Sequence, residues 1–225
     1  QKNDRNDAQA IAEAASRSTT PLVSQKNIEV QNIQSLLRIR ERCVRQRTAL
    51  VNQIRGLLLE YGIVIPQGRC HVLKRLPEIL EDGDNELTHV MREEFALLGD
   101  ELRQWDQRIE VYDEKLKGFY QQNELCQRMG EVRGIGLISA VSILTELNDP
   151  NVYKNGRHFA AFLGLVPKQH SSGGKSKLQG ITKRGDKQLR YYLIHGARAV
   201  LSYVDKRDDP LSNCCLLYTS DAADE

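Results

Sequence analysis

The feature that most restricts the fold of this chain is a pair of long stretches in which apolar residues recur at alternating spacings of three and four. The first stretch carries Ile33, Leu36, Arg40, Cys43, Arg47, Leu50, Ile54, Leu57 and Tyr61. Its stripe is widened by one position by Leu37, Val44, Val51 and Leu58. The second stretch carries Met91, Phe95, Leu98, Leu102, Trp105, Ile109, Tyr112, Leu116 and Phe119. This rhythm predicts two amphipathic helices with a coiled-coil seam, and the two arginines in the first stretch predict irregular packing.

The two predicted helices are joined by residues 62–86, GIVIPQGRCHVLKRLPEILEDGDNE, and Gly62 and Pro66 predict the end of the first helix. We expect an antiparallel hairpin of about 50 Å, at 1.5 Å per residue. The stripes are too wide for one hairpin to cover, which predicts a dimer or tetramer. The ordinary role of such a hairpin is a core or a dimerisation device. The alternative is a nucleic-acid grip through the arginines of its first helix, which are Arg38, Arg40, Arg42, Arg45, Arg47 and Arg55.

The composition changes after Gly130. The segment RGIGLISAVSILTELND places Gly134 and Gly136 in a turn before an apolar helix. This arrangement resembles the helix-hairpin-helix element, in which amides at a helix N-terminus hold a DNA phosphate. An ordinary tight turn between helices is the alternative. The segment HFAAFLGLVP then predicts a short helix closing at Gly164 and Pro167, and DKQLRYYLIHGARAVLSYV predicts a final helix.

Residues 170–185, HSSGGKSKLQGITKRG, form a glycine-rich basic segment that predicts a small β-hairpin or loop. The region 168–198 has a local charge of +7, which is typical of a polyanion-binding surface. A P-loop is excluded because Gln169 stands where that motif needs glycine. Three readings remain: a turn, a phosphate clamp, or a site in which Ser171 or Ser172 is a nucleophile beside His170. The positive charge around a phosphate would come from Lys175, Lys183, Arg184 and Arg190.

The N-terminal segment KNDRNDA places Asp4 and Asp7 three residues apart at the start of a predicted helix. Carboxylates at this spacing share a helix face and are able to approach one divalent cation. The alternative is a simple helix cap.

Together these segments resemble the IS110/IS116 family of bacterial insertion-sequence transposases. KNDRNDA resembles the end of that family's RuvC-like DEDD nuclease domain. GIGLISAVSILTEL and FAAFLGLVPKQHSSGGKSKLQGITKRGDKQLRYYLIHGARA resemble its C-terminal transposase domain. The resemblance implies an RNA-guided DNA recombinase that uses Mg²⁺ and a serine nucleophile.

Carried onto this sequence, the resemblance implies that Asp4 and Asp7 are the last two acids of the DEDD set and hold Mg²⁺. It implies that Ser172 is the nucleophile, with Ser171 as the alternate, and that the partners are DNA and a guide RNA. The residues expected to bind DNA are Gly134, Gly136, Lys175, Lys177, Lys183, Arg184 and Arg190. The first Asp and the Glu of the set would lie upstream of Gln1, so we expect a fragment that is inactive alone.

The expected fold is mainly α, with a remnant of an α/β RuvC-like domain (1–27), a coiled-coil hairpin (28–127) and a helix-hairpin-helix-like C-terminal domain (128–205). Residues 206–225 are expected to be a truncated end, and CLLYTSDAADE resembles a non-native adapter-derived tail. No run of 18 apolar residues occurs, which predicts no membrane span. Five cysteines without a CxxC pair favour a cytoplasmic protein. The rival functions are a non-catalytic helix-hairpin-helix nucleic-acid-binding module and a dimerising scaffold.

Overall fold

A computed structural model describes residues 3–17, 25–147, 152–172, 175–210 and 212–214 of the chain. The predicted adapter-derived tail lies outside these residues. The elements in chain order are α1 (Asp4–Ser16), α2 (Ile28–Glu60), α3 (Arg69–Glu81), α4 (His89–Gln122), α5 (Glu124–Gly130), α6 (Leu137–Leu147), α7 (Gly156–Phe162), β1 (Pro167–Ser172), β2 (Lys175–Ile181), α8 (Lys187–Leu201) and a short 3-10 helix (Val204–Lys206). The expectation of a mainly helical chain with a small two-stranded antiparallel sheet is confirmed.

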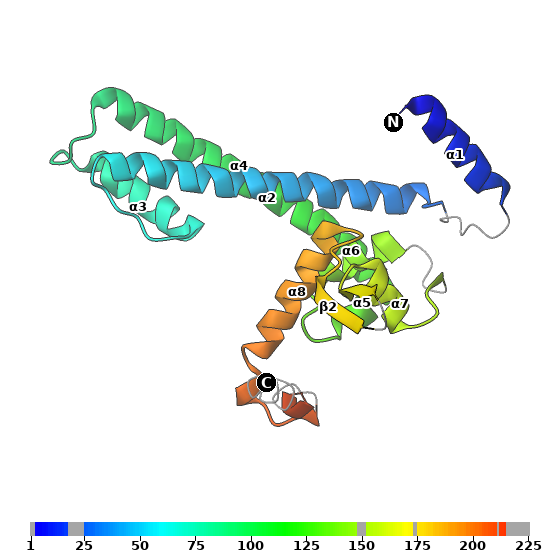
Figure 1. Ribbon diagram of the computed structural model, residues 1–225. Helices are drawn as coiled ribbons and strands as arrows, with labels where there is room; N and C mark the ends of the chain where they lie inside the picture. Colours follow the sequence, from blue (N-terminus) through cyan, green and yellow to red (C-terminus); the bar gives the residue numbers. More distant parts are fainter. Residues whose placement is uncertain (1–2, 18–24, 148–151, 173–174, 211, 215–225) are drawn as a thin grey trace.

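The two long helices α2 and α4 form the predicted hairpin, with α3 at one end and the C-terminal part at the other (Figure 1). Local sequence sets their limits. Asn27 caps α2 by accepting a hydrogen bond from the amide of Val30 at 2.7 Å. The helix gives way at Tyr61 to Gly62, whose φ of 71° is left-handed and suits glycine. None of the described helices is both long enough and apolar enough to cross a bilayer.

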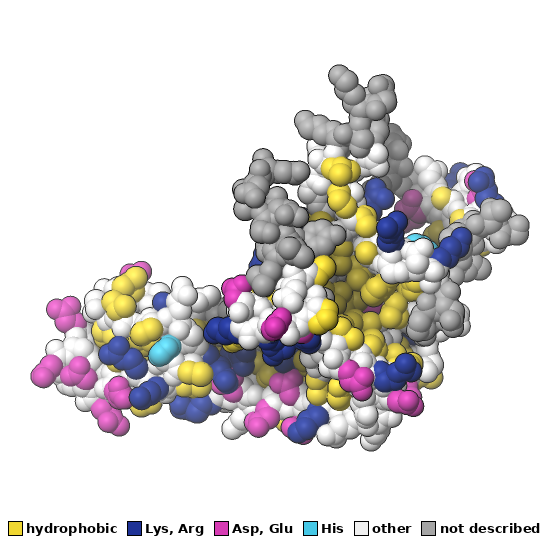
Figure 2. Space-filling view, turned by 90° about the horizontal axis from the view of Figure 1, so that it is seen from below, with side chains coloured by type: hydrophobic (Ala, Val, Ile, Leu, Met, Phe, Trp, Pro, Cys, Tyr) yellow, Lys and Arg dark blue, Asp and Glu magenta, His cyan; other side chains and the backbone are white. Residues whose placement is uncertain are grey.

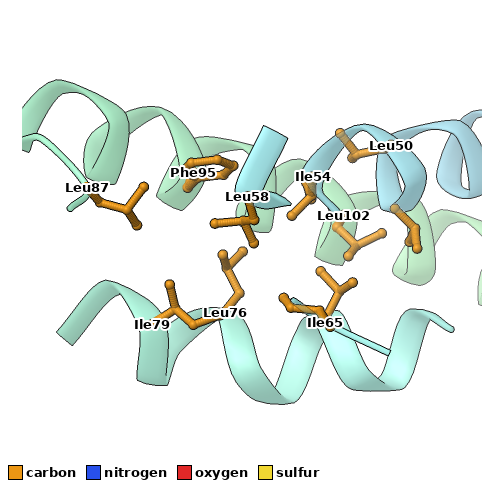
Figure 3. Close-up of a cluster of buried hydrophobic side chains, with 11 residues drawn as sticks. Leu50, Ile54, Leu58, Ile65, Leu76, Ile79, Leu87, Phe95 and Leu102 are labelled. Atoms are coloured by element: carbon orange, nitrogen blue, oxygen red, sulfur yellow. The ribbon is translucent and has the colours of Figure 1, made fainter. Parts of the chain in front are cut away.

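The main hydrophobic core lies at the closed end of the hairpin, between α2, α3 and α4 (Figure 3). Leu58, Phe95 and Leu102 are each 0% exposed there. We described residues 62–86 only as the segment that joins the two long helices, and the structure forms α3 within it. The spacing of Val72, Leu76 and Ile79 was the available signal, and Gly68 and Pro77 concealed it.

The middle of the hairpin is joined by ion pairs. Arg40 pairs with Asp113, and Arg47 pairs with Asp106 at 2.9 Å. The two arginines are seven residues apart on α2, and the two aspartates are seven residues apart on α4. The arginines that interrupt the apolar stripe therefore each have a matched partner across an antiparallel seam.

One assignment within the seam is wrong by one position. Leu57, which we placed in the main stripe, is 36% exposed, whereas its neighbour Leu58 is 0% exposed. Leu37 and Val51, which also lie beside the strict three-four pattern, are buried too, so the packed face of α2 is broader than that pattern. Leu58, which we treated as a widening of the stripe, is the residue that packs into the core.

The open end of the hairpin is continuous with the C-terminal part. Ile33 and Leu37 of α2 pack with Leu116 of α4, Cys126 of α5 and Val141 of α6 in a second cluster. Burial raises the pKa of the Cys126 thiol to about 11. Because one cluster draws on both regions, the C-terminal part is fixed on the hairpin through α5 and α6.

Candidate functional site

The segment that carries the candidate nucleophiles is an antiparallel β-hairpin. In its register Ser172 pairs with Lys175, Ser171 with Ser176, and His170 with Lys177. Paired residues share a face of a ladder and neighbours alternate. The positions of Ser172, Lys175, His170 and Lys177 thus belong to one face, and that of Ser171 belongs to the other. Gly173 and Gly174, together with the side chains of residues 171–177, lie outside the description.

The segment after β2, residues 182–186, lies tightly against the end of α7. That helix ends in a Schellman turn, in which Gly164 has a φ of 69° and the amide of Leu165 donates to the carbonyl of Ala160 at 3.0 Å. A Cβ atom on Gly164 would overlap the backbone of Arg184. Only glycine permits both this turn and this approach of the two backbones.

Lys183 occupies an unusual backbone conformation within this segment. Its φ of 57° is left-handed, which costs a non-glycine residue about 1 to 2 kcal/mol. Its amide donates to the carbonyl of Gly164 at 3.0 Å, and the amide of Thr182 donates to that of Val166 at 2.9 Å. The side chains of Lys183 and Arg184 are exposed. A fixed backbone therefore presents two adjacent cations to solvent.

Arg190 does not lie where the sequence suggested. It is only 7% exposed, and its Nη1 donates to the carbonyl of Leu163 at 2.9 Å and to that of Arg184 at 2.8 Å. We expected Arg190 to contact DNA, and the structure instead places its guanidinium in the interior. The reason is its place on α8, which Asp186 caps by accepting from the amide of Leu189 at 2.6 Å. The first turn of α8 faces the end of α7.

The Gly134–Gly136 turn has two different sides. Gly134 has a φ of 84° and lies against Gly196 of α8, so closely that a Cβ on either would meet the other's backbone. Gly136 is exposed with open space around its Cα, and its carbonyl accepts from the amide of Ala140 at 2.9 Å to begin α6. Gly134 thus serves packing against α8, and Gly136 is the glycine with room for a phosphate.

Asp4 and Asp7 lie in the first turn of α1, which Asn3 caps by accepting from the amide of Arg5 at 3.1 Å. Both carboxylates are exposed, and α1 buries none of its residues. Among the described residues no group of three or more His, Cys, Asp or Glu is placed to hold a metal ion. Figure 1 shows α1 well apart from β2. Within one chain the structure does not bring the acidic pair to the serine hairpin.

In Figure 2 the kind of side chain on the surface differs between the helical hairpin and the C-terminal part. Lys and Arg side chains gather along the middle of the hairpin, whereas hydrophobic side chains gather over the C-terminal part. The exposed apolar residues of that part include Leu125, Val132 and Tyr203. An arginine at the edge of this region is paired, because Arg133 donates to Asp209 at 2.8 Å and thereby lowers the pKa of that carboxyl. The charge of Arg133 is thus offset within the chain, and the region is mainly apolar.

The structure thus joins a helical hairpin to a small basic domain with serines on a two-stranded ribbon, and sequence comparison identifies the family. The model described as transposase IS116/IS110/IS902 family matches residues 126–210, and a DEDD transposase model of the IS110 type matches residues 1–63. This chain belongs to the IS110/IS116 transposase family. The resemblance noted from the motifs is confirmed.

Curated relatives are similar over most of the chain. The transposase for insertion sequence element IS1111A of Coxiella burnetii is 47% identical over 94% of this chain and 58% of its own length. A probable family 20 transposase of Pseudomonas aeruginosa is 42% identical over 94% of this chain and 63% of its own. The transposase for IS1328 of Yersinia enterocolitica is 37% identical over 94% and 62%. The chain thus spans about three fifths of the length of these relatives.

Two features of the site were missed in the sequence. The contact of Gly196 with Gly134 joins positions distant in the chain, and a glycine within an otherwise ordinary helix was its only local sign. The role of Asp186 as the N-cap of α8 was also missed, although the sequence carried a signal for it, because an Asp directly before a helix is a common N-cap.

Proposed function

We propose that the complete protein transposes DNA, and that this chain supplies the β-hairpin of β1 and β2, whose Ser172 hydroxyl attacks the DNA backbone. The observation that carries the proposal is the register of β1 and β2, in which Ser172 pairs with Lys175 and lies on the same face as His170 and Lys177. The family membership and the transposase names of the relatives support the reaction class.

In the proposed step the Oγ of Ser172 forms a bond to a backbone phosphorus, and one P–O bond to the neighbouring deoxyribose breaks. The serine proton passes to a base, and the released sugar oxygen takes up a proton. His170 is the candidate base because it is two positions before Ser172 on one strand and exposed. Lys183 and Arg184 offset the charge of the phosphate.

Asp4 and Asp7 are proposed to bind Mg²⁺. They fit this role because they lie in one helical turn, both are exposed, and Mg²⁺ commonly takes one or two protein carboxylates together with substrate phosphates. When bound, the ion supplies positive charge beside the phosphate. Since α1 lies apart from the β-hairpin within one chain, we further propose that the acidic pair of one subunit serves the serine of another in a dimer or tetramer.

A guide RNA is the second proposed nucleic-acid partner. The charge of +7 over residues 168–198, to which the buried Arg190 contributes one, favours binding of a polyanion such as RNA. The stretch also contains exposed His170, Lys183 and Arg184 on two different segments of the backbone. This part of the proposal is tested by omitting RNA from the experiment below.

The test is covalent attachment of DNA, measured by denaturing electrophoresis of the complete protein with labelled duplex DNA, with and without guide RNA and Mg²⁺. We expect a shifted protein–DNA species in the wild type and none in Ser172→Ala. We expect Asp7→Asn to abolish the species while Mg²⁺-independent binding stays almost intact. Ser171→Ala is the matched control, because its register position belongs to the opposite face.

The outcomes separate the alternatives. If Ser171→Ala loses the covalent species and Ser172→Ala keeps it, the nucleophile is Ser171. If both variants and Asp7→Asn form the species, the nucleophile proposal is wrong. If the wild type binds DNA but never forms the species, the rival holds, which is a non-catalytic module that binds phosphate at the exposed Gly136 turn.

A further inference from the structure

Arg190 is a charged side chain that is almost entirely buried, and no function described so far uses it. It is 7% exposed, and burying a guanidinium is costly unless good acceptors receive its hydrogen bonds. Its Nη1 finds two backbone carbonyls, those of Leu163 and Arg184, at 2.9 and 2.8 Å. Leu163 is the C-cap of α7, where the helix dipole is negative.

The second of these carbonyls is that of Arg184. Arg184 and Lys183 are the two cations that are proposed to offset the charge of a DNA phosphate. The Nη1 of Arg190 links the carbonyl of Arg184 to that of Leu163, and the amide of Lys183 donates to the carbonyl of the adjacent Gly164. Between these two bonds Lys183 is held in its left-handed conformation. Without them a lysine would leave that conformation for an ordinary one, and its side chain would point elsewhere.

We infer that Arg190 is a positioning residue, which orders residues 182–186 so that Lys183 and Arg184 meet a nucleic-acid phosphate, and that it does not itself contact nucleic acid. The inference rests on the proposed binding of DNA near the β-hairpin. It changes the role of Arg190 from a surface cation to an interior clamp. The charge of Arg190 is then needed for the shape of the loop and not for the attraction of DNA.

The test is a double-mutant cycle on binding of a fluorescein-labelled duplex DNA to the complete protein, followed by fluorescence anisotropy over a range of salt. Lys183→Ala/Arg184→Ala should flatten the slope of log Kd against log salt by about one to two, at about one per lost phosphate contact. Arg190→Gln should flatten it similarly and raise Kd about fivefold to tenfold, a coupling typical of residues in one network. In the Lys183→Ala/Arg184→Ala background, Arg190→Gln should then change Kd less than about twofold.

Arg198→Gln is the matched control because Arg198 lies on the same helix and is exposed. The change in binding free energy caused by Arg198→Gln, whether large or small, should add to the change caused by Lys183→Ala/Arg184→Ala. If the effect of Arg190→Gln also adds, with a further flattening of about one in the salt slope, then Arg190 contacts phosphate and the inference is wrong.

A second variant covers the chance that Arg190→Gln unfolds, which circular dichroism would show. Arg190→Lys keeps the charge but presents a single ammonium in place of a planar guanidinium. We expect it to fold, to raise Kd, and to increase amide hydrogen exchange in a peptide covering residues 181–186 while a peptide covering α6 is unchanged. Wild-type affinity in spite of raised exchange at 181–186 would overturn the inference.

This experiment is separate from the test of chemistry. It measures binding only, so a failure of Ser172 as nucleophile leaves it intact. If the wild type shows no salt-dependent DNA binding, the proposed function fails at this site and the inference fails with it. If binding is salt-dependent but the cycle shows no coupling, only the inference fails.

Discussion

The hairpin and the C-terminal part are both mainly helical, but different kinds of contact hold them. At the closed end of the hairpin, large side chains such as Leu58, Phe95 and Leu102 fill the space between three helices. The C-terminal part has a small cluster centred on Ile143, Leu163 and Leu189. It is completed by backbones that approach each other at glycines.

The difference matters for how each region tolerates change. In the hairpin the free energy of folding comes from apolar area, which depends on side-chain volume. In the C-terminal part, shape depends on places where a Cβ atom does not fit, as at Gly134 with Gly196 and at Gly164 with Arg184. The hairpin is a scaffold built on side chains, and the proposed site is held by its backbone.

The largest effect is expected at the closed end of the hairpin. Leu58→Ala should lower the free energy of unfolding by about 3 to 5 kcal/mol, because the side chain is fully buried and leaves a cavity. Its neighbour Leu57 is 36% exposed, so Leu57→Ala should cost less than about 1 kcal/mol. Urea unfolding followed by circular dichroism measures both. Equal costs would mean that the buried face of α2 is not the one described.

The next effect contrasts glycines in the two regions. Gly164→Ala should destabilise the protein by about 2 to 4 kcal/mol, from a left-handed backbone and an overlap with Arg184. Gly56 lies within α2 with open space around it, so Gly56→Ala should stabilise the protein by about 0.5 to 1 kcal/mol. Thermal unfolding of both variants gives the signs. A stabilising Gly164→Ala would contradict the backbone account of the C-terminal part.

The smallest effect is expected at the ion pairs in the middle of the hairpin. Asp106 accepts from Arg47 at 2.9 Å and pairs with Arg69 at 2.7 Å, and its side chain is 18% exposed. Asp106→Ala should cost about 1 to 3 kcal/mol, since charged hydrogen bonds are lost where water is partly excluded.

The matched control is Asp100→Ala, which breaks an exposed pair with Arg103 and should change stability by no more than about 0.5 kcal/mol. Both variants are compared with the wild type by urea unfolding at low and high salt. If Asp106→Ala matches Asp100→Ala, the ion pairs of Asp106 contribute no more to stability than an exposed pair does.

The sequence by itself predicted the elements whose causes are local. The long helices were predicted from a three-four period, and the structure adds that Asn27 and Thr88 cap them. The β-hairpin and the final helix follow from glycines and from periodicity in the same way. The long motif of residues 159–199 also carried the family, because a match of that length rarely arises by chance.

Tertiary structure decided everything that depends on a partner element. Whether Leu57 or Leu58 is buried depends on where α4 lies, and α3 forms in spite of Pro77 because its apolar face meets the other two helices. Arg190 looked like a cation for DNA because its sequence neighbours are basic. It became an interior residue because the carbonyls of Leu163 and Arg184, from two other segments, converge on its guanidinium. Charge is a property of the residue, whereas exposure is a property of the packing around it.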